Sequence, residues 1–436
     1  MKLNQKKPLA TGKNAGCSFC GSDNMSLVID FGDVALAGAF LKTEQFREEK
    51  KYKLQIFFCK NCYLLQIVNK IPPEILFKNY FYFSSAIGTL KEHFKEYAEE
   101  VTKRFLIPDK ATVVEIGCND GVLLNPFSKN GVRTVIGVDP SENVVKSISN
   151  PDIIVVNDFF SENVAQKILD KYGSADLIAA NNVYAHISDI HDITSGVEKL
   201  LSKDGVFIFE VHYIANLIEE IQYDMIYHEH LYYYSFIALE KFFSQYNMEI
   251  FDVKKIPIHA GSMRYYVRKK GGLKKENISK NVISLKKGEL DKKYDKVETY
   301  LGYARRVENS KINLLRLIKE LRETDNKIIY GYGASGRANT IIQYCGIDKD
   351  MMECIIDDAP AKQGFYTPGS HFLIRPREYM ETNPPDYILV FAWSFVKEII
   401  KKNLSYLNNG GKIIIPLPEV KIISSRNGKI NEESFR

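Results

Sequence analysis

The stretch Val113-Val114-Glu115-Ile116-Gly117-Cys118-Asn119-Asp120-Gly121 decides the fold of this chain. Its β-branched start predicts a buried strand, and its glycines predict a turn directly after that strand. The apolar residues after the turn can open a helix. A dinucleotide-binding loop would read G-x-G-x-x-G, whereas this loop carries no third glycine. The stretch therefore predicts an α/β sheet with a nucleotide-type loop, and it disfavours dinucleotide binding.

The next two predicted strands end on residues that suit a nucleoside. The strand TVIGVDP ends in Asp139, at the distance where an acidic residue binds a ribose hydroxyl pair in a βαβ unit. The strand IIVVND is followed by two phenylalanines that can frame an adenine ring. This order suits S-adenosylmethionine (SAM), whose methionine part the loop glycines admit. We predict that SAM binds to Glu115, Gly117, Asn119, Gly121, Asp139, Asp158, Phe159 and Asn181.

The rest of the chain predicts several domains. Its 436 residues exceed the about 250–300 at which one hydrophobic core usually splits. Apolar runs alternate with helix-compatible stretches over residues 76–270, which predicts a parallel sheet covered by helices. Residues 271–325 predict a helical connector, and residues 326–436 repeat the strand-then-helix rhythm in a second, Rossmann-like domain.

Composition and charge bear on the partners and the compartment. Hydrophobic residues make up 45% and charged residues 26%, and no apolar run approaches the about 18 residues that span a bilayer. The N-terminal stretch lacks the apolar segment of a secretion signal. The net charge of +5 is small for this length, and basic residues are interleaved with acidic ones. We expect a cytoplasmic protein that binds neither a membrane nor a nucleic acid.

Four of the seven cysteines form two C-x-x-C pairs, Cys17 with Cys20 and Cys59 with Cys62. Four thiolates suit a closed tetrahedral zinc site, and four protein ligands leave no open position for a catalytic water. Residues 1–75 are therefore predicted to form a small domain with structural zinc. Two alternatives stay open at this point, buried free cysteines and a zinc ribbon that binds nucleic acid.

A polar string, Tyr227-His228-Glu229-His230, comes directly after a predicted helix. It is not the H-E-x-x-H zinc motif, because Tyr232 occupies the position of the second histidine. Histidine titrates near neutral pH and suits proton transfer, for example removal of a proton beside a carbonyl. The alternative is a cluster of hydrogen-bonded polar residues under the sheet.

These motifs together resemble the nucleotide-diphosphate-sugar (NDP-sugar) C-methyltransferases of deoxysugar pathways. The resemblance runs nearly end to end. It includes the four cysteines, VALAGAFL, YFYFSSAIGTLKEHF, EIGCNDGVLL, NNVYAHISDI, IYHEHLYYYS, HAGSMRYYV, GYGASGRANTIIQY, IDDAPAKQGFYTPGSH and FAWSF. It implies a zinc-binding N-terminal domain, a class I SAM methyltransferase core and a Rossmann-like C-terminal domain that completes the sugar-nucleotide site.

The resemblance also implies roles for individual residues. His230 corresponds to the base that removes a proton beside a sugar ketone, and further catalytic positions are Tyr227, Glu229, His186, Tyr80 and Tyr82. The strand-turn at Tyr330–Gly336 has the shape of a phosphate loop, with a purely structural Rossmann half as the alternative. We place the substrate's pyrophosphate near Ser335 or Asn339 of this loop. The predicted substrate-binding residues are Tyr332, Ser335, Arg337 and Asn339. The sequence departs from the family pattern at Glu210–Tyr213 and at Arg337, where the sugar pocket can differ.

The expected reaction is SAM-dependent methylation at C3 of a nucleotide-linked 4-keto-6-deoxy sugar through an enolate. Methylation at C5 or on oxygen is an alternative, as is a non-catalytic protein that binds zinc and nucleic acid. The sequence leaves the oligomeric state open, with a monomer favoured.

Overall fold

A computed structural model describes residues 16–77, 84–86, 88–258, 260–273, 276–426 and 428–435. The chain forms two compact units that interleave along the sequence. Unit 1 contains the segments up to Ser26, Phe58–Ile214 and Leu231–Lys296, and unit 2 contains Leu27–Phe57, Ala215–His230 and the chain from Val297 onward.

Unit 1 is built around a seven-stranded sheet. It holds β3 (Leu65–Ile67), α1 (Pro73–Phe77), η2 (Ser84–Ala86), α2 (Gly88–Phe105), η3 (Pro108–Lys110), β4 (Thr112–Ile116), α3 (Leu124–Lys129), β5 (Thr134–Val138), α4 (Glu142–Val145), β6 (Ile153–Val156), α5 (Glu162–Tyr172), β7 (Ala175–Asn181), α6 (Ile190–Leu200), β8 (Leu201–His212), β9 (Tyr232–Tyr233), α8 (Phe236–Ser244), β10 (Met248–Ile256), β11 (Ser262–Lys269) and α9 (Lys280–Asp291).

The strand order of this sheet locates a ligand crevice. The order is β10-β11-β8-β7-β4-β5-β6. Strands β4 to β8 run parallel, whereas β11 is antiparallel to both β8 and β10. The chain proceeds from β4 outward to β5 and β6 and then returns to β7 on the other side of β4. In open α/β sheets, ligands bind at the carboxyl ends of strands where the order reverses in this way. The crevice is therefore bordered by the loops after β4 and β7.

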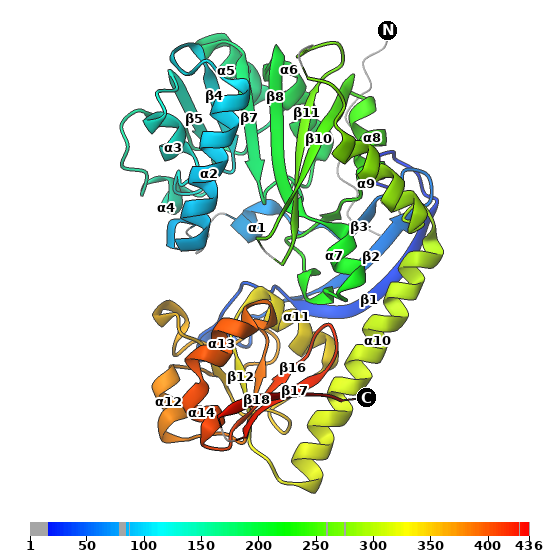
Figure 1. Ribbon diagram of the computed structural model, residues 1–436, viewed down its shortest axis with the longest axis vertical. Coiled ribbons are helices and arrows are strands. Elements are labelled where there is room, and N and C mark those ends of the chain that lie inside the picture. The colour runs from blue at the N-terminus through cyan, green and yellow to red at the C-terminus, as the bar shows by residue number, and fades with distance from the viewer. Residues whose placement is uncertain are drawn as a thin grey trace. The chain divides into compact units, whose positions relative to one another are not determined.

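Alternating residues of the central strands supply the core on both faces of the sheet. On one face, Val113 and Leu177 are fully buried against α2 and α3 (Figure 1). Helix α2 is amphipathic, because its buried residues Leu90, Phe94, Tyr97 and Val101 recur at helical spacing. The opposite face carries an aromatic cluster of Tyr184, Phe207, Phe209 and Phe243. The helices are thereby fixed over the sheet, and the loops at its carboxyl edge are positioned.

Unit 2 is built around a second seven-stranded sheet, shown in yellow to red in Figure 1. It holds all or most of β1 (Met25–Ala35), η1 (Thr43–Gln45), β2 (Lys51–Cys59), α7 (Ile214–Glu219), η4 (Tyr223–Met225), α10 (Val297–Lys319), the π-helical turn η5 (Glu320–Thr324), β12 (Ile329–Tyr332), α11 (Gly336–Cys345), β13 (Ile355–Ile356), η6 (Pro360–Lys362), β14 (Ile374–Arg375), α12 (Arg377–Thr382), β15 (Tyr387–Val390), η7 (Trp393–Phe395), α13 (Val396–Lys402), α14 (Leu404–Asn408), β16 (Lys412–Ile415), β17 (Lys421–Arg426) and β18 (Lys429–Ser434).

The sheet of unit 2 has its own reversal of strand order. The order is β14-β13-β12-β15-β16-β17-β18, parallel as far as β16 and antiparallel for β17 and β18. The loops after β12 and β15 border its crevice. Residues 27–57 belong to this unit because they bond to α11: Gln343 Oε1 accepts a hydrogen bond from the Ala35 amide at 2.8 Å.

The predicted α/β fold class with two Rossmann-like sheets is confirmed. Strands β12, β13, β15 and β16 follow one another with helices between them in the second sheet, and the β17–β18 hairpin completes it. The division into segments 1–75, 76–270, 271–325 and 326–436 stays a prediction. Among the described residues, no helix has the length and apolar character needed to cross a membrane.

Candidate active site

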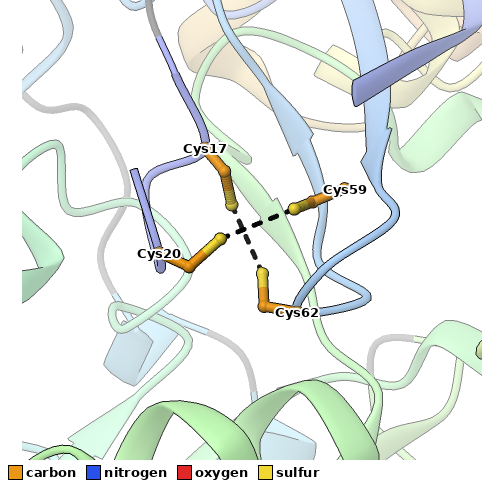
Figure 2. A group of neighbouring side chains, drawn as sticks. All are labelled: Cys17, Cys20, Cys59 and Cys62. Atoms are coloured by element: carbon orange, nitrogen blue, oxygen red, sulfur yellow. Dashed lines mark hydrogen bonds between the residues drawn. The ribbon is translucent and has the colours of Figure 1, made fainter. Parts of the chain in front are cut away.

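The four predicted metal ligands come together in unit 1. Figure 2 shows the side chains of Cys17, Cys20, Cys59 and Cys62 pointing toward one centre, and their sulfur atoms lie within 4.8 Å of one another. The Sγ atoms of Cys17 and Cys62 are 3.3 Å apart, and those of Cys20 and Cys59 are 3.6 Å apart. Sulfurs bonded at about 2.3 Å to one zinc ion would be about 3.8 Å apart in a tetrahedron. The cluster fits a structural zinc ion.

The two C-x-x-C segments have the same backbone hydrogen bonds. The Cys17 carbonyl accepts from the Gly21 amide at 2.8 Å, and the Cys59 carbonyl accepts from the Tyr63 amide at 2.9 Å. Gly21 and Tyr63 both have positive φ, of 70° and 71°. This tight turn brings both sulfurs of each pair to the same side. Both C-x-x-C segments therefore form the same tight turn, and each turn directs its two sulfurs toward one centre.

The loop after β4 is fixed by contacts with its two neighbouring strands. Gly117 donates a backbone hydrogen bond to the Val138 carbonyl of β5 at 2.7 Å. Its φ is +69°, and a Cβ placed there would lie 2.3 Å from Val183, in the loop after β7. Gly117 is thus required both for its backbone conformation and for the close approach of the two loops.

Asp139, directly after β5, accepts one backbone hydrogen bond on each carboxylate oxygen, and one of the two comes from this loop. Its Oδ2 accepts from the Asn119 amide at 3.0 Å, and its Oδ1 accepts from the Ser141 amide at 2.8 Å. The Asn157 side chain donates to the Asp139 carbonyl at 2.8 Å. Asp139, Asn119 and the end of β6 are therefore connected by hydrogen bonds.

The same crevice contains buried polar atoms without a hydrogen-bond partner among the described residues. They are Oε2 of Glu115, Oδ1 of Asp120 and both side-chain amide atoms of Asn181. Burial raises the pKa of Glu115 well above its usual range. Orphaned buried polar groups are costly unless a ligand or water satisfies them. A cofactor with amine and hydroxyl groups, such as SAM, suits this set.

Two further segments border the loop. The backbone amide of Ser84 donates to Asn119 Oδ1 at 3.0 Å, and that of Ser85 donates to Asp120 Oδ2 at 2.9 Å. After β6, Phe159 remains 38% exposed, although aromatic residues are usually buried. Asp158 is exposed and accepts from the Phe159 amide at 2.8 Å. Phe159 therefore offers an apolar surface at the place where the sequence predicts the adenine.

A buried ionic cluster next to this crevice was not predicted from the sequence. Glu210, at the end of β8, has no exposed surface and accepts from Arg264 Nε at 2.6 Å. Its other oxygen lies 2.8 Å from Nε2 of His93 on α2. The Arg264 guanidinium lies 3.8 Å from the centre of the Tyr97 ring. His93 lies within the resemblance motif YFYFSSAIGTLKEHF, but the partners come from distant strands and have no local signal.

In unit 2, the predicted string Tyr227–His230 has a defined geometry. His230 Nδ1 lies 2.7 Å from the Met225 carbonyl oxygen. A carbonyl oxygen only accepts hydrogen bonds, so Nδ1 carries a proton, and the neutral ring has its lone pair on Nε2. The Tyr227 and His230 rings are 4.0 Å apart between centroids. Burial raises the pKa of Glu229 to about 7. The string thus combines an oriented imidazole with a carboxyl that holds its proton near neutral pH.

The glycine loop after β12 carries the predicted substrate residues. Ser335 caps α11, since its side chain accepts from the Ala338 amide at 3.2 Å. Tyr332 is buried, and its hydroxyl oxygen lies 3.3 Å from each carboxylate oxygen of Asp358. Asn339 is fully buried, and its side chain donates to the Ala37 carbonyl at 2.6 Å.

The same loop holds a signal that was not recognised from the sequence. Gly331, Gly333 and Gly336 have the G-x-G-x-x-G spacing that the first loop lacks. A Cβ on Gly336 would lie 3.8 Å from the Tyr227 ring, so this loop and the string Tyr227–His230 are neighbours within unit 2.

The remaining predicted residues are His186, Tyr80 and Tyr82. His186 is half-buried in unit 1, in the loop after β7, where its amide donates to the Val183 carbonyl at 2.8 Å. Tyr80 and Tyr82 lie outside the described residues.

Family models match three successive parts of the chain. Residues 17–77 match a zinc binding domain, residues 90–253 a methyltransferase domain, and residues 257–418 a C-methyltransferase C-terminal domain. The chain is also 26% identical over 97 residues to the ubiquinone biosynthesis O-methyltransferase of Azorhizobium caulinodans, which covers 22% of this chain and 38% of that protein. A solved structure, the SAM-bound magnesium protoporphyrin IX methyltransferase of Synechocystis, aligns with 41% of this chain and 79% of its own, at 15% identity and a TM-score of 0.32.

A further relative matches nearly the whole chain. The C-methyltransferase NovU of Streptomyces niveus is 31% identical over 412 residues, which are 94% of this chain and 97% of NovU. The match thus extends through most of each segment that the family models match. The chain therefore belongs to the SAM-dependent C-methyltransferases that carry a zinc-binding N-terminal domain.

Proposed function

We propose that this C-methyltransferase acts on a nucleotide-linked 4-keto-6-deoxy sugar and adds the methyl group at C3. In this reaction His230 removes the C3 proton, which is acidified by the neighbouring ketone, and an enolate forms. The sugar class and the carbon rest on the family resemblance of the motifs, and the role of His230 rests on its geometry.

The observation that carries the proposal is the contact between His230 Nδ1 and the Met225 carbonyl, at 2.7 Å. It keeps a proton on Nδ1, so the neutral ring has its lone pair on Nε2, where it can accept a proton. Histidine also titrates near neutral pH, as a general base requires. The C3 proton would therefore move to Nε2, while Nδ1 keeps its hydrogen bond to the backbone.

The enolate oxygen needs a hydrogen-bond donor, because stabilising developing charge is usually the largest catalytic contribution. Tyr227 and Glu229 are the neighbouring candidates in unit 2, and His186 in unit 1 is a third. Since burial raises the pKa of Glu229 to about 7, its carboxyl keeps a proton in a large part of the molecules at neutral pH. A protonated carboxyl can donate where a carboxylate cannot.

In this proposal SAM binds in the crevice of unit 1, and the sugar nucleotide binds in the crevice of unit 2. Glu115, Gly117, Asn119, Gly121, Asp139, Asp158, Phe159 and Asn181 of unit 1 would hold SAM, which supplies an electrophilic methyl group when bound. The loop at Tyr332, Ser335, Arg337 and Asn339 of unit 2 would hold the sugar nucleotide. There, the positive charge on Lys362 suits a pyrophosphate, since Lys362 Nζ lies 2.7 Å from the Ala334 carbonyl of the same loop.

The test is solvent deuterium exchange at the sugar carbon in the His230→Asn variant. We expect exchange and methylation to be abolished, while binding of S-adenosylhomocysteine (SAH), measured by calorimetry, stays unchanged. His191→Asn is the matched control, because His191 lies on α6 beside Tyr246 and should keep wild-type exchange. Exchange at the wild-type rate in His230→Asn would exclude this histidine as the base.

The substrate itself is tested with a panel of nucleotide-linked 4-keto sugars and methyl-labelled SAM. We expect label at C3 of the product. Label at C5 or on oxygen would reject the proposed position while leaving the methyltransferase assignment intact.

A further inference from the structure

We infer that Asp224, Arg337 and Trp393 form a positioning clamp, the Asp224 clamp, that holds the Met225 carbonyl against His230. Through this clamp, the loops of the C-terminal sheet select the ring tautomer of the base. The inference rests on the proposed function of His230.

Asp224 is the centre of the clamp and is fully enclosed. Its exposed fraction is 0%. Its Oδ2 accepts hydrogen bonds from Arg337 Nε at 2.7 Å and from Trp393 Nε1 at 2.9 Å. A second guanidinium nitrogen, Arg337 Nη2, lies 2.7 Å from the same oxygen.

A carboxyl in this position depends on its partners. Burial raises the pKa of Asp224, and the Arg337 guanidinium opposes that rise. Breaking a buried ion pair by removing one partner is strongly unfavourable, because the other charge is left without compensation. The segment that carries Asp224 is therefore held at one place as long as Arg337 keeps its orientation.

Arg337 itself is oriented by two loops of the C-terminal sheet. It stands in the first turn of α11, after β12. Its Nη1 donates to Ser394 Oγ at 3.2 Å, and its guanidinium lies 5.0 Å from the centre of the Trp393 ring. Trp393 and Ser394 come after β15, so the clamp joins the two loops that border the crevice of unit 2.

The clamp includes the residue next to Met225, whose carbonyl contacts His230. Asp224 directly precedes Met225, and Ile226 is the next residue after it. The Ile226 carbonyl accepts a hydrogen bond from Thr340 Oγ1 of α11 at 3.2 Å. Both neighbours of Met225 are thus bonded to α11, on residues three positions apart that share one helix face. The Met225 carbonyl has little freedom to turn away from His230.

This arrangement has a chemical consequence. If the Met225 carbonyl moves, Nδ1 of His230 loses the acceptor that keeps its proton there. The lone pair can then sit on either nitrogen, and only part of the molecules present Nε2 as the base. Small displacements of a reacting group can lower a rate by about 100-fold, even when the change lies away from the chemistry. Asp224 and Arg337 are thus positioning residues, and Arg337 acts through Asp224.

The experiment compares Asp224→Asn, Arg337→Gln and Trp393→Phe with the wild type. Nitrogen NMR of protein labelled with ¹⁵N-histidine reports the tautomer of His230, whose signal is identified by its loss in His230→Asn. Deuterium exchange at the sugar carbon reports the rate of proton removal, and calorimetry with SAH reports the integrity of unit 1. Arg375→Gln is the matched control, since Arg375 also lies over an aromatic ring, 4.6 Å from the centre of Tyr379.

We expect Asp224→Asn and Arg337→Gln to shift His230 away from the Nδ1–H tautomer and to slow exchange by about 10- to 100-fold, with SAH affinity unchanged. Trp393→Phe removes one hydrogen bond and should show the same change to a smaller extent, which keeps the test decisive if the charged variants fold poorly. Addition of guanidinium to Arg337→Ala should restore part of the rate. An unchanged tautomer and an unchanged rate in all variants would overturn the clamp. If His230→Asn itself leaves exchange intact, the proposed function fails instead.

Discussion

The loop after β4 in unit 1 and the loop after β12 in unit 2 are built with the same hydrogen bonds. In unit 1, the Gly117 amide donates to Val138 at 2.7 Å; in unit 2, the Gly333 amide donates to Ile356 at 2.8 Å. Asp139 accepts from the first loop, and Asp357 accepts from the Ala334 amide of the second at 2.7 Å. Each of the two sheets thus fixes this loop through one aspartate.

Each loop is bonded to an aspartate, but the other residues around the two loops differ. In unit 2 the helix begins directly after the loop, at Gly336, and the Lys362 ammonium bonds to the loop. In unit 1 the helix begins only at Leu124, and the crevice retains the unpartnered polar atoms of Glu115 and Asn181. A helix start beside cations suits an anion, whereas buried carboxyl and amide groups suit amines and hydroxyls. One scaffold can therefore serve two chemically different ligands.

The largest expected effect comes from removing the charge of the first aspartate. Asp139→Asn should weaken SAH binding by about 100-fold, because charge-assisted hydrogen bonds to two loop amides are lost together with the proposed ribose contact. Calorimetry with SAH measures this change directly.

The matched variant is Asp357→Asn, which should leave SAH affinity unchanged and raise the KM for the sugar nucleotide. If both variants weaken SAH binding equally, the proposed division of ligands between the loops is wrong. If neither does, the first loop is not the cofactor site.

A second, smaller effect is expected from the glycine of the first loop. Gly117→Ala should destabilise the protein by about 2 kcal/mol, because alanine is strained at φ +69° and its Cβ would lie 2.3 Å from Val183. Urea unfolding measures the loss.

The double variant Gly117→Ala with Val183→Ala separates the two causes. Shortening Val183 removes the steric overlap but not the backbone strain, so we expect partial recovery relative to Val183→Ala alone. Gly131→Ala is the control: its φ is +80°, with open space around the added Cβ, and it reports backbone strain alone. Equal costs at Gly117 and Gly131 would contradict the close approach of the two loops.

How much of the site could be predicted depended on distance along the chain. Glu115, Gly117 and Asp139 could be proposed as site residues because strand, turn and acidic residue follow one another within one βαβ unit. The clamp could not be proposed, because Arg337 and Asp224 are 113 residues apart and neither has a local signal. Likewise, residues 27–57 lie beside the cysteines in sequence, yet they pack on α11 through bonds such as that between Ala35 and Gln343, 308 residues apart. Periodicity reports which face of an element is buried, not which element covers it.

The smallest expected effect is on the pH dependence of the free energy of unfolding, and it comes from the buried carboxyl of Glu229 in unit 2. Burial raises the pKa of Glu229 in unit 2 to about 7, above the about 4.3 of an exposed glutamate. Because the folded state binds this proton more tightly, the contribution is fully present below about pH 4 and is lost as the pH rises through 7. From pH 6 to pH 8, the free energy of unfolding should fall by about 1 kcal/mol from this group. The fall is measured as the difference between wild type and Glu229→Gln, which lacks the titrating carboxyl.

Glu48→Gln is the control for this measurement, because Glu48 is exposed and its replacement should leave the pH dependence as in the wild type. SAH sharpens the comparison further. If its binding is confined to unit 1, saturating SAH raises the stability at both pH values but leaves the difference between wild type and Glu229→Gln unchanged. A difference that disappears on SAH binding would mean that Glu229 responds to the cofactor, and the two crevices could not be treated as independent sites.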